Sequence, residues 1–452
     1  MKCNDAKLSL ETHLPPEVLD IIVSHVEKPS HLLALALTCK TLSVIILPRH
    51  IRYRNVSCNL HDGWDRLQDC IRHPDRAQNI RILTLIGPSD RDGYQHFKSP
   101  PEHFLADVIG TMERLSRLNI VVEVPQCDTD FKGFWNRVTV YRNLRCLDVG
   151  LACPTVLADL LYDTDDLTFL HELKMNIIFQ VDPEVFERMC TFIRKNVNLK
   201  MLDISCTPPV EGTLWDIPGS SHFPDLKSLT LDSFFVGFDK SPSPDIVLNC
   251  IQIHDRLETL NTTVELPLGT LPPGTLSNLN VLYNSSNNDA ILNILTCPTL
   301  NYQPRPLVDI GGFTCDSQFF DALDYVNCEA VHSLRDVQFA STAGLAELPN
   351  VFPNLRFLSV NAGQMWDESY GGIRNLLRAE WAGVIRRFPL LIAFHGVCFF
   401  TDTRQTDPFE EELQQVRAIF PLIERLDTSR RDTVLIIDRI NGSWKMEKRH
   451  YQ

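Results

Sequence analysis

The chain has 452 residues, of which 44% are apolar and 22% charged, ordinary values that exclude a fibrous or disordered protein. A chain of this length is too long for a single compact core, so we expect either several domains or one elongated repeat array. The formal net charge of −14 argues against nucleic-acid binding, which depends on clustered Lys and Arg.

Residues 12–57 are expected to form three short, very apolar helices. Pro16 can start the first helix without losing a hydrogen bond, and that helix is expected to end near Glu27. Ser30 and Thr38 are the expected N-caps of the second and third helices. Three such helices cannot bury all their aliphatic side chains among themselves. Part of their surface should therefore either meet another chain or cap the segment that follows.

The same segment carries a recognisable series of motifs. It opens with Leu14-Pro15-Pro16-Glu17-Val18-Leu19, followed by Ile22, a leucine-rich stretch at 31–37 and then Thr38-Cys39-Lys40. This series resembles the F-box, which opens with Leu-Pro-x-Glu and an aliphatic pair and later carries Val-Cys-Lys/Arg. Two positions depart from the family, because Thr38 stands in place of Val and Leu42 in place of a frequent Trp.

The resemblance implies that residues 1–57 are a helical docking module for the Skp1 adaptor and, through it, for the cullin and RING subunits of a ubiquitin ligase. The docking residues that it carries over are Leu14, Pro15, Glu17, Val18, Leu19, Ile22, Leu33, Cys39 and Leu42. From the helical pattern alone, a cap on the following repeats is an equally good interpretation. The exposure of Leu14, Pro15 and Ile22 distinguishes the two.

A six-residue pattern recurs from residue 80 onward, with leucine or a substitute at positions 1, 4 and 6. The copies start at Ile80, Leu115, Leu144, Leu170, Leu199, Leu226, Leu257, Leu276, Leu334 and Leu355. Between Ile80 and Leu276 successive starts lie 19 to 35 residues apart, close to the period of leucine-rich repeats. Positions 4 and 6 would face inward on a short strand, and helical stretches such as 182–193 would separate the strands.

The sequence therefore predicts an α/β protein, a short three-helix F-box followed by an irregular leucine-rich-repeat solenoid with parallel strands on the concave face and helices on the convex face. Residues 58–79 are expected to be a linker or first cap, and 80–429 the solenoid. Residues 430–452 are expected to be a C-terminal cap and tail, with Val434–Ile437 as a buried edge strand. The pattern is weakest between 284 and 330.

The sequence contains no nucleophile elbow, Walker loop, dinucleotide-binding glycine motif or metalloprotease helix. The carboxylates at Asp163, Asp165, Asp166 and Glu410-Glu411-Glu412 are interpreted as solvated charges, and His395 as a core or edge histidine. The aromatic pairs Phe234-Phe235 and Phe399-Phe400 are interpreted as core residues rather than binding anchors. No catalytic residue, cofactor or metal is predicted.

Cellular context follows from the N-terminus and the 14 cysteines. The N-terminus lacks the apolar core of a signal peptide, and no apolar run approaches the ~20 residues of a membrane helix. The cysteines show no C-x-x-C pair with zinc-site spacing, which favours reduced thiols. We expect a cytoplasmic or nuclear, non-enzymatic adaptor that binds Skp1 and a target protein, with no nucleic-acid or membrane partner. The alternative is a leucine-rich-repeat scaffold without ligase association.

Overall fold

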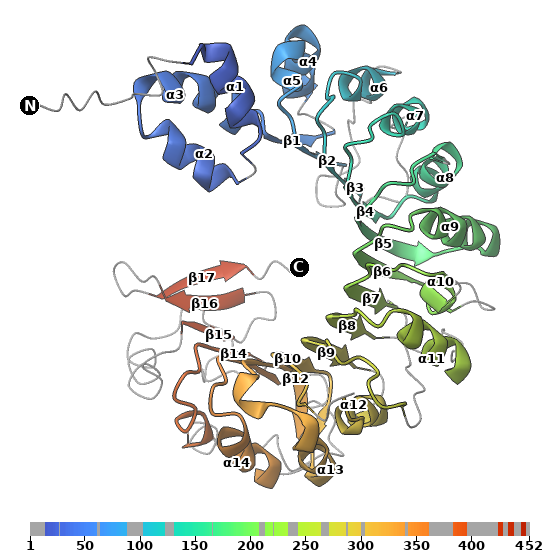
Figure 1. The fold of residues 1–452 in the computed structure, drawn as a ribbon, viewed down its shortest axis with the longest axis vertical. Coiled ribbons are helices and arrows are strands. Elements are labelled where there is room, and N and C mark those ends of the chain that lie inside the picture. The colour runs from blue at the N-terminus through green and yellow to red at the C-terminus, as the bar shows by residue number, and fades with distance from the viewer. Residues whose placement is uncertain are drawn as a thin grey trace, which may run out of the picture. The chain divides into compact units, whose positions relative to one another are not determined.

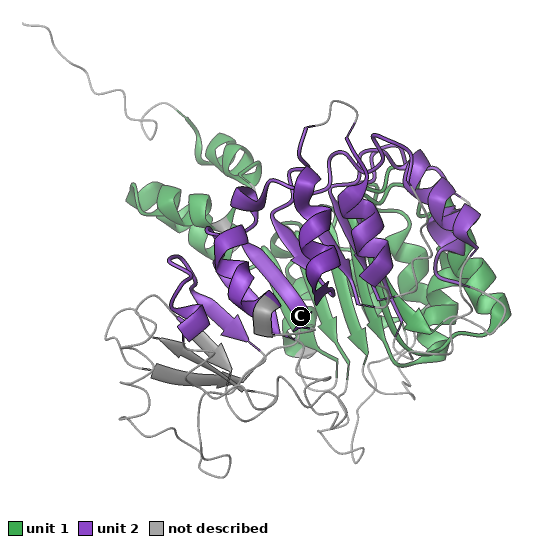
Figure 2. Cartoon of the chain, turned by 90° about the horizontal axis from the view of Figure 1, so that it is seen from below, with its two compact units in different colours: residues 1–212, 234–238 green, residues 213–233, 239–452 purple. Residues whose placement is uncertain are grey.

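The computed structural model divides the chain into two compact units, residues 1–212 with 234–238, and residues 213–233 with 239–452 (Figure 2). The structure describes residues 14–26, 28–60, 64–87, 103–122, 131–164, 166–207, 213–219, 221–233, 243–263, 271–285, 288–299, 303–339, 342–360, 383–395, 424–427, 433–437 and 444–448. Each unit is described by itself.

Unit 1 begins with a helical bundle, called the N-terminal module below. It comprises α1 (Pro16–Ser24), α2 (Pro29–Ala36), α3 (Lys40–Ile45) and the π-helix η2 (Ile46–Ile51). Its core is small, formed by Val23, Leu32, Ala36 and Ile46, with Val26, Leu35, Leu42 and Ile51 packed against it. The three predicted helices are present, and α1 ends at Ser24, before the predicted Glu27.

The caps of α2 and α3 differ from the predicted Ser30 and Thr38. Lys28 is the N-cap of α2, because Pro29 has a helical φ and no N–H to satisfy, and so starts the helix itself. The N-cap of α3 is Cys39, whose Sγ accepts a hydrogen bond from the Leu42 N–H at 3.4 Å. The Thr38 hydroxyl is used at the end of α2 instead, where it donates to the Leu35 carbonyl.

Six parallel strands follow in unit 1, one from each repeat. They are β1 (Asn55–Asn59), β2 (Ile82–Ile86), β3 (Arg117–Val122), β4 (Cys146–Leu151), β5 (Glu172–Gln180) and β6 (Met201–Thr207). Each pairs with the next in register, so that Leu83 stands opposite Leu118 and Leu118 opposite Leu147. Positions 4 and 6 of every copy in this unit are buried, as the pattern predicts.

Helices cover one face of the unit 1 sheet (Figure 1). They are α4 (Trp64–Arg72), α5 (Pro74–Ala77), α6 (Phe104–Ile109), α7 (Lys132–Val138), α8 (Pro154–Asp163) and α9 (Pro183–Lys195). In α9, Asp182 caps the first turn by accepting from the Val185 N–H, and the helix buries Phe186, Met189 and Ile193. This helix confirms the prediction for 182–193.

The repeats begin earlier than predicted. Strand β1 pairs with β2, with Val56 opposite Leu83 and Cys58 opposite Leu85. The predicted linker or first cap at 58–79 holds the end of β1 together with α4 and α5. It is therefore part of the first repeat, which the leucine pattern missed because Tyr53 and Cys58 occupy leucine positions.

Unit 2 repeats the same arrangement with eight strands in parallel order. They are β7 (Ser228–Asp232), β8 (Thr259–Thr262), β9 (Val281–Asn284), β10 (Asp309–Gly311), β12 (Ser333–Phe339), β13 (Phe357–Val360), β14 (Ala393–His395) and β15 (Arg425–Asp427). A two-residue strand, β11 (Thr314–Cys315), pairs with the far end of β12.

The helices of unit 2 vary in length and include two 3₁₀ helices. They are α10 (Asp216–Gly219), α11 (Pro244–Ile253), α12 (Asn288–Thr296), α13 (Ser317–Asp321), the 3₁₀ helices η4 (Ala322–Tyr325) and η5 (Cys328–Ala330), and α14 (Thr342–Val351). As in unit 1, they lie on one side of the strands (Figure 1). The leucine spacing, the parallel register and the helical connections make each unit a leucine-rich-repeat array of the α/β class.

The C-terminal prediction needs a correction. Strand β16 (Thr433–Ile437) pairs antiparallel with both β15 and β17 (Trp444–Lys448), so the predicted edge strand at Val434–Ile437 has two neighbours. The second neighbour comes from the segment expected to be a polar tail. Its sequence alternates apolar and charged residues from Trp444 to Glu447, which is the period of a strand.

Two of the predicted repeat frames are wrong by three residues. Leu282 pairs with Leu260, so the copy assigned to Leu276 starts at Leu279. In the same way Leu334 pairs with Leu358, so its copy starts at Val331. The poorly patterned region 284–330 holds one further repeat, in which Ile310 on β10 stands opposite Leu282.

Candidate interaction surfaces

The predicted docking residues of the N-terminal module fall into three groups by exposure. Pro15, Glu17, Val18, Ile22 and Leu33 are exposed, Leu14, Cys39 and Leu42 are half-buried, and Leu19 is buried. Pro15 and Ile22 are therefore not covered by the repeats of unit 1. Leu19 is buried, so it offers almost no surface to a partner.

Four further aliphatic side chains of the module are exposed that the motif did not mark. They are Ile21, Leu37, Val44 and Leu47, and Leu37 is 79% exposed. Together with Val18, Ile22 and Leu33 they are called the exposed aliphatic set below. Isolated exposed apolar residues are normal on soluble proteins, but seven within one small module are a concentration of the kind found at interaction sites. The motif does not mark Ile21, Leu37, Val44 and Leu47, although the excess of aliphatic residues over what three helices can bury could have indicated them.

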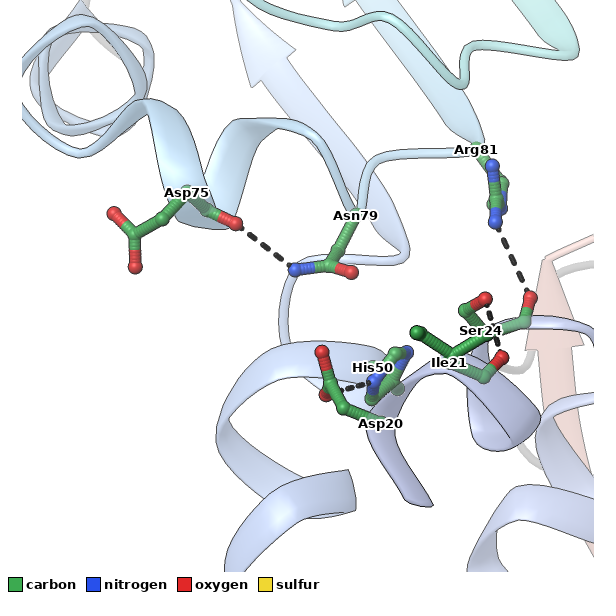
Figure 3. Close-up of polar contacts among 7 residues, drawn as sticks. All are labelled: Asp20, Ile21, Ser24, His50, Asp75, Asn79 and Arg81. Atoms are coloured by element: carbon green, nitrogen blue, oxygen red, sulfur yellow. Dashed lines mark hydrogen bonds and ion pairs between the residues drawn. The ribbon is translucent and has the colours of Figure 1, made fainter. Parts of the chain in front are cut away.

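A buried polar contact fixes the module internally. The His50 Nε2 and the Asp20 Oδ1 lie 2.8 Å apart, linking η2 to α1 (Figure 3). His50 is almost fully buried, and this burial lowers its pKa even though Asp20 acts in the opposite direction. The contact therefore links η2 to the middle of α1.

A second contact joins the module to the repeats of unit 1. The Arg81 Nη2, just before β2, donates to the Ser24 carbonyl at the end of α1, 3.2 Å away (Figure 3). The Arg81 Nη1 donates to the Arg114 carbonyl at 3.1 Å. One side chain therefore links α1 to two successive repeats.

The sheet face of unit 1 that lies opposite the helices carries polar side chains at alternate positions. The Arg117 Nη2 lies 2.6 Å from the Glu172 Oε2, across the intervening strand β4, and the Lys174 Nζ lies 3.6 Å from the Asp203 Oδ2. Cys146 lies on β4, between Arg117 and Glu172. Burial and a hydrogen bond to Glu172 raise the pKa of the Cys146 thiol to about 12, so this thiol is not a nucleophile at neutral pH.

The equivalent face of unit 2 holds a cluster of aromatic and charged residues. The Tyr283 hydroxyl donates to the Asp336 Oδ2 at 2.8 Å, and the Arg335 Nε lies 2.9 Å from the Asp309 Oδ1. The Arg335 guanidinium carbon is 5.4 Å from the centre of the Tyr283 ring. Burial raises the pKa of both Tyr283 and Asp309. Tyr and Arg are frequent anchors at protein interfaces, so this cluster is a candidate contact site.

The remaining sequence candidates form no catalytic arrangement within the described residues. His395 lies on β14 with its ring centre 5.1 Å from that of Phe357, and Asp166 is exposed. Among the described residues no group of three His, Cys, Asp or Glu side chains could hold a metal ion. Asp165, Glu410-Glu411-Glu412, Phe234-Phe235 and Phe399-Phe400 lie outside the described residues. None of the described helices is long and apolar enough to cross a bilayer.

No protein-family model and no curated protein matches the chain. Among solved structures, a chain of the yeast Rad7 and Elc1 complex aligns with a TM-score of 0.43 and 13% identity, over 84% of this chain and 87% of that one. A leucine-rich-repeat protein of Leptospira interrogans aligns with a TM-score of 0.32 and 12% identity, over 82% of this chain and 100% of that one. The fold assignment rests on the strand register and repeat spacing of this chain.

Proposed function

We propose that this chain is a non-catalytic adaptor of a cullin–RING ubiquitin ligase. In this proposal the N-terminal module is an F-box that docks on a Skp1-type adaptor, and the leucine-rich repeats capture a target protein. Its place of action would be the cytoplasm or the nucleus, where such ligases work.

The observation that supports the proposal is the exposed aliphatic set. Val18, Ile22 and Leu33 belong both to this set and to the residues that the F-box motif marks for docking. Burying them against a helical partner would remove apolar surface from water, which is the main favourable term in such association. Their exposure is expected of a docking surface and not of residues whose role is to cap the repeats.

The mechanism follows from proximity. An adaptor that holds the lysines of a target near a charged ubiquitin carrier raises their effective concentration without forming or breaking bonds itself. The chain then needs a docking surface and a capture surface, and no catalytic group. The polar sheet faces of the two units, including the cluster of Tyr283 and Arg335, are the proposed capture surfaces.

Co-purification with Skp1 tests the proposal. We would compare the wild-type chain with an Ile22→Glu, Leu33→Glu double variant, since both side chains are exposed and their replacement leaves the module core intact. A matched control is the Ile178→Glu, Val197→Glu double variant. These two side chains lie among the repeats and are as exposed as Ile22 and Leu33, at 48% and 49% against 49% and 47%.

The expected result is stoichiometric binding of Skp1 by the wild type and the control, and at least a tenfold loss of affinity in the module variant, since two buried aliphatic contacts contribute about 3 kcal/mol. Circular dichroism should show the same helix content in all three proteins. If the folded wild type does not bind Skp1, the ligase proposal fails and a repeat scaffold without ligase association remains.

A further inference from the structure

The six strands of unit 1 carry more carboxylates than cations. Their charged residues are Arg117, Asp148, Glu172, Lys174 and Asp203, and all of them lie on the sheet face opposite the helices (Figure 1). Arg117 pairs with Glu172, and Lys174 pairs with Asp203. Since both cations are engaged in this way, the carboxylate of Asp148 is left as an excess negative charge on this face.

Asp148 lies in the middle of the face, on β4. It stands opposite Asn119 on β3 and Lys174 on β5. Its carboxylate makes no hydrogen bond or close ion pair with any residue of the described ranges. Arg117 and Lys174 act on it at longer range, but burial has the larger effect and raises its pKa. Because burying an unpaired charge costs free energy, a cation supplied by a partner would be favourable here.

Two carboxamide oxygens near Asp148 also lack a donor among the described residues. The Asn119 Nδ2 donates to the Thr84 Oγ1 at 3.0 Å, whereas the Asn119 Oδ1 has no partner. The Asn176 Oδ1 on β5 has none either, and neither oxygen is exposed to water. Buried acceptors are satisfied in most folded proteins. The terminal torsion of asparagine is soft, so each amide can turn toward a donor that arrives on the face.

Gly150 leaves space for an incoming side chain. It comes two positions after Asp148 on the same face and stands opposite Val121 on β3 and Asn176 on β5. The nearest atoms to a Cβ built at Gly150 would be two Val121 methyl groups at 3.8 and 3.9 Å and the Ile120 carbonyl oxygen at 4.0 Å. The sheet can therefore be approached closely beside Asp148.

We infer that this face binds an arginine side chain of the captured protein, with the Asp148 carboxylate as its ion-pair partner. A guanidinium group has five N–H donors and no acceptor, and its planar fork matches a carboxylate. Donors not used by Asp148 can serve Asn119 and Asn176, which a compact ammonium group would reach less well. The inference rests on the proposed function only in taking the sheet face as the capture surface.

Fluorescence anisotropy of the full chain with a labelled decapeptide of alternating serine and arginine tests the inference. The same peptide with citrulline, a neutral analogue of arginine, is the matched probe. The main variant is Asp148→Asn, which removes the charge and keeps the shape. The control Asp107→Asn removes the same charge from an exposed position on α6, on the helical side of the sheet. Gly150→Leu is a second variant, which keeps the charge and fills the space beside it.

We expect the wild type and Asp107→Asn to bind the arginine peptide alike. Asp148→Asn and Gly150→Leu should bind at least about tenfold more weakly, because a hydrogen-bonded ion pair is lost or blocked. Since Asp148→Asn removes an unpaired, half-buried charge, it should melt no lower than the wild type. The loss of binding would then not be a loss of folding.

An equal loss in Asp107→Asn would show that the acidic chain attracts the peptide non-specifically and would overturn the inference. Equal binding of the citrulline peptide, or no binding by the wild type, would overturn it as well. A lysine peptide that binds as tightly as the arginine peptide would contradict the choice of guanidinium. Skp1 takes no part in this assay, so a negative result leaves the proposed docking of Skp1 untouched.

Discussion

The carboxamide oxygen of Asn196 accepts a hydrogen bond from the Leu170 backbone N–H, 3.1 Å away and 26 residues earlier in the chain. The Asn196 Nδ2 donates to the carbonyls of Leu167 and Phe192, at 2.9 and 3.0 Å. The side chain is completely buried. It therefore joins the end of α9 to the loop before β5 and satisfies three backbone groups that water cannot reach.

The replacement Asn196→Ala would leave these three buried backbone groups without a partner, and each such group costs about 1 to 3 kcal/mol. We expect the free energy of unfolding of the chain to fall by about 3 to 5 kcal/mol. Urea unfolding followed by circular dichroism measures it. The control Asn79→Ala removes an exposed bond to the Asp75 carbonyl (Figure 3) and should cost less than about 1 kcal/mol. A similar loss of stability in both variants would show that the buried hydrogen bonds of Asn196 contribute no more than one exposed hydrogen bond.

The start of some repeats could not be predicted from the sequence. Where apolar residues recur every three positions, more than one of them can be taken as position 1 of the pattern. Leu276, Leu279 and Leu282 fit two overlapping frames, and the correct one places the polar Asn284 at position 6. The strand β10 was missed because Gly312 occupies that position in its repeat. The repeats of unit 1 were predictable because their positions 4 and 6 hold mostly leucine, isoleucine and valine.

The candidate interaction surfaces were also only partly predictable from the sequence. The F-box motif marks side chains by their place in a short contiguous segment, and five of its nine residues are exposed in the structure. The contacts of Arg81 with the carbonyls of Ser24 and Arg114 could not be predicted in this way, because these residues lie 57 and 33 positions from Arg81. The pairing of β2 with β3 brings Arg81 beside Arg114, and the packing of α1 on the repeats adds Ser24.

Gly312 gives a second prediction. Its φ is +74°, and a Cβ at this position would overlap the backbone carbonyl group of Asn284 on the neighbouring repeat. Gly312→Ala therefore combines left-handed strain with a backbone clash and should lower the free energy of unfolding by about 3 kcal/mol. Gly383→Ala is the control, since a Cβ there would meet no atom within 4 Å. Equal stability of the two variants would show that the Asn284 backbone does not approach Gly312 closely enough to exclude a Cβ atom.

His254 makes the stability dependent on pH. Its Nε2 accepts from the Phe223 N–H at 3.2 Å, so the proton of the neutral ring lies on Nδ1, which donates to the Cys250 carbonyl at 2.8 Å. Burial lowers the pKa of His254. As pH falls below about 6.5, the unfolded state takes up a proton before the folded state does, so stability is lost on acidification.

We expect the free energy of unfolding to decrease between pH 7.5 and pH 5.5, with His50 contributing in the same direction because burial also lowers its pKa. His254→Leu should be less stable at pH 7.5, since the Phe223 N–H loses its acceptor, and its stability should change less with pH. An unchanged slope in His254→Leu would show that the proton is taken up elsewhere.

Cys39 could either contact a docking partner or cap α3, and the sequence does not distinguish these two roles. The motif marks it as a docking residue, whereas in the structure its Sγ accepts from the Leu42 N–H and caps α3. Serine is a better N-cap than alanine by about 1 kcal/mol. If capping is its role, Cys39→Ser keeps both the stability of the module and the affinity for Skp1. Cys39→Ala then lowers stability by about that amount, since it removes the acceptor.

Thermal unfolding and Skp1 binding, measured on the same two variants, distinguish the roles. A docking thiol would contribute its apolar sulfur to the partner, so serine and alanine would both weaken binding while only alanine changed stability. A capping thiol predicts that binding follows stability in both variants, because the orientation of α3 positions Val44, 65% exposed, in the exposed aliphatic set. Weaker binding by a fully stable Cys39→Ser protein would therefore return Cys39 to the docking surface.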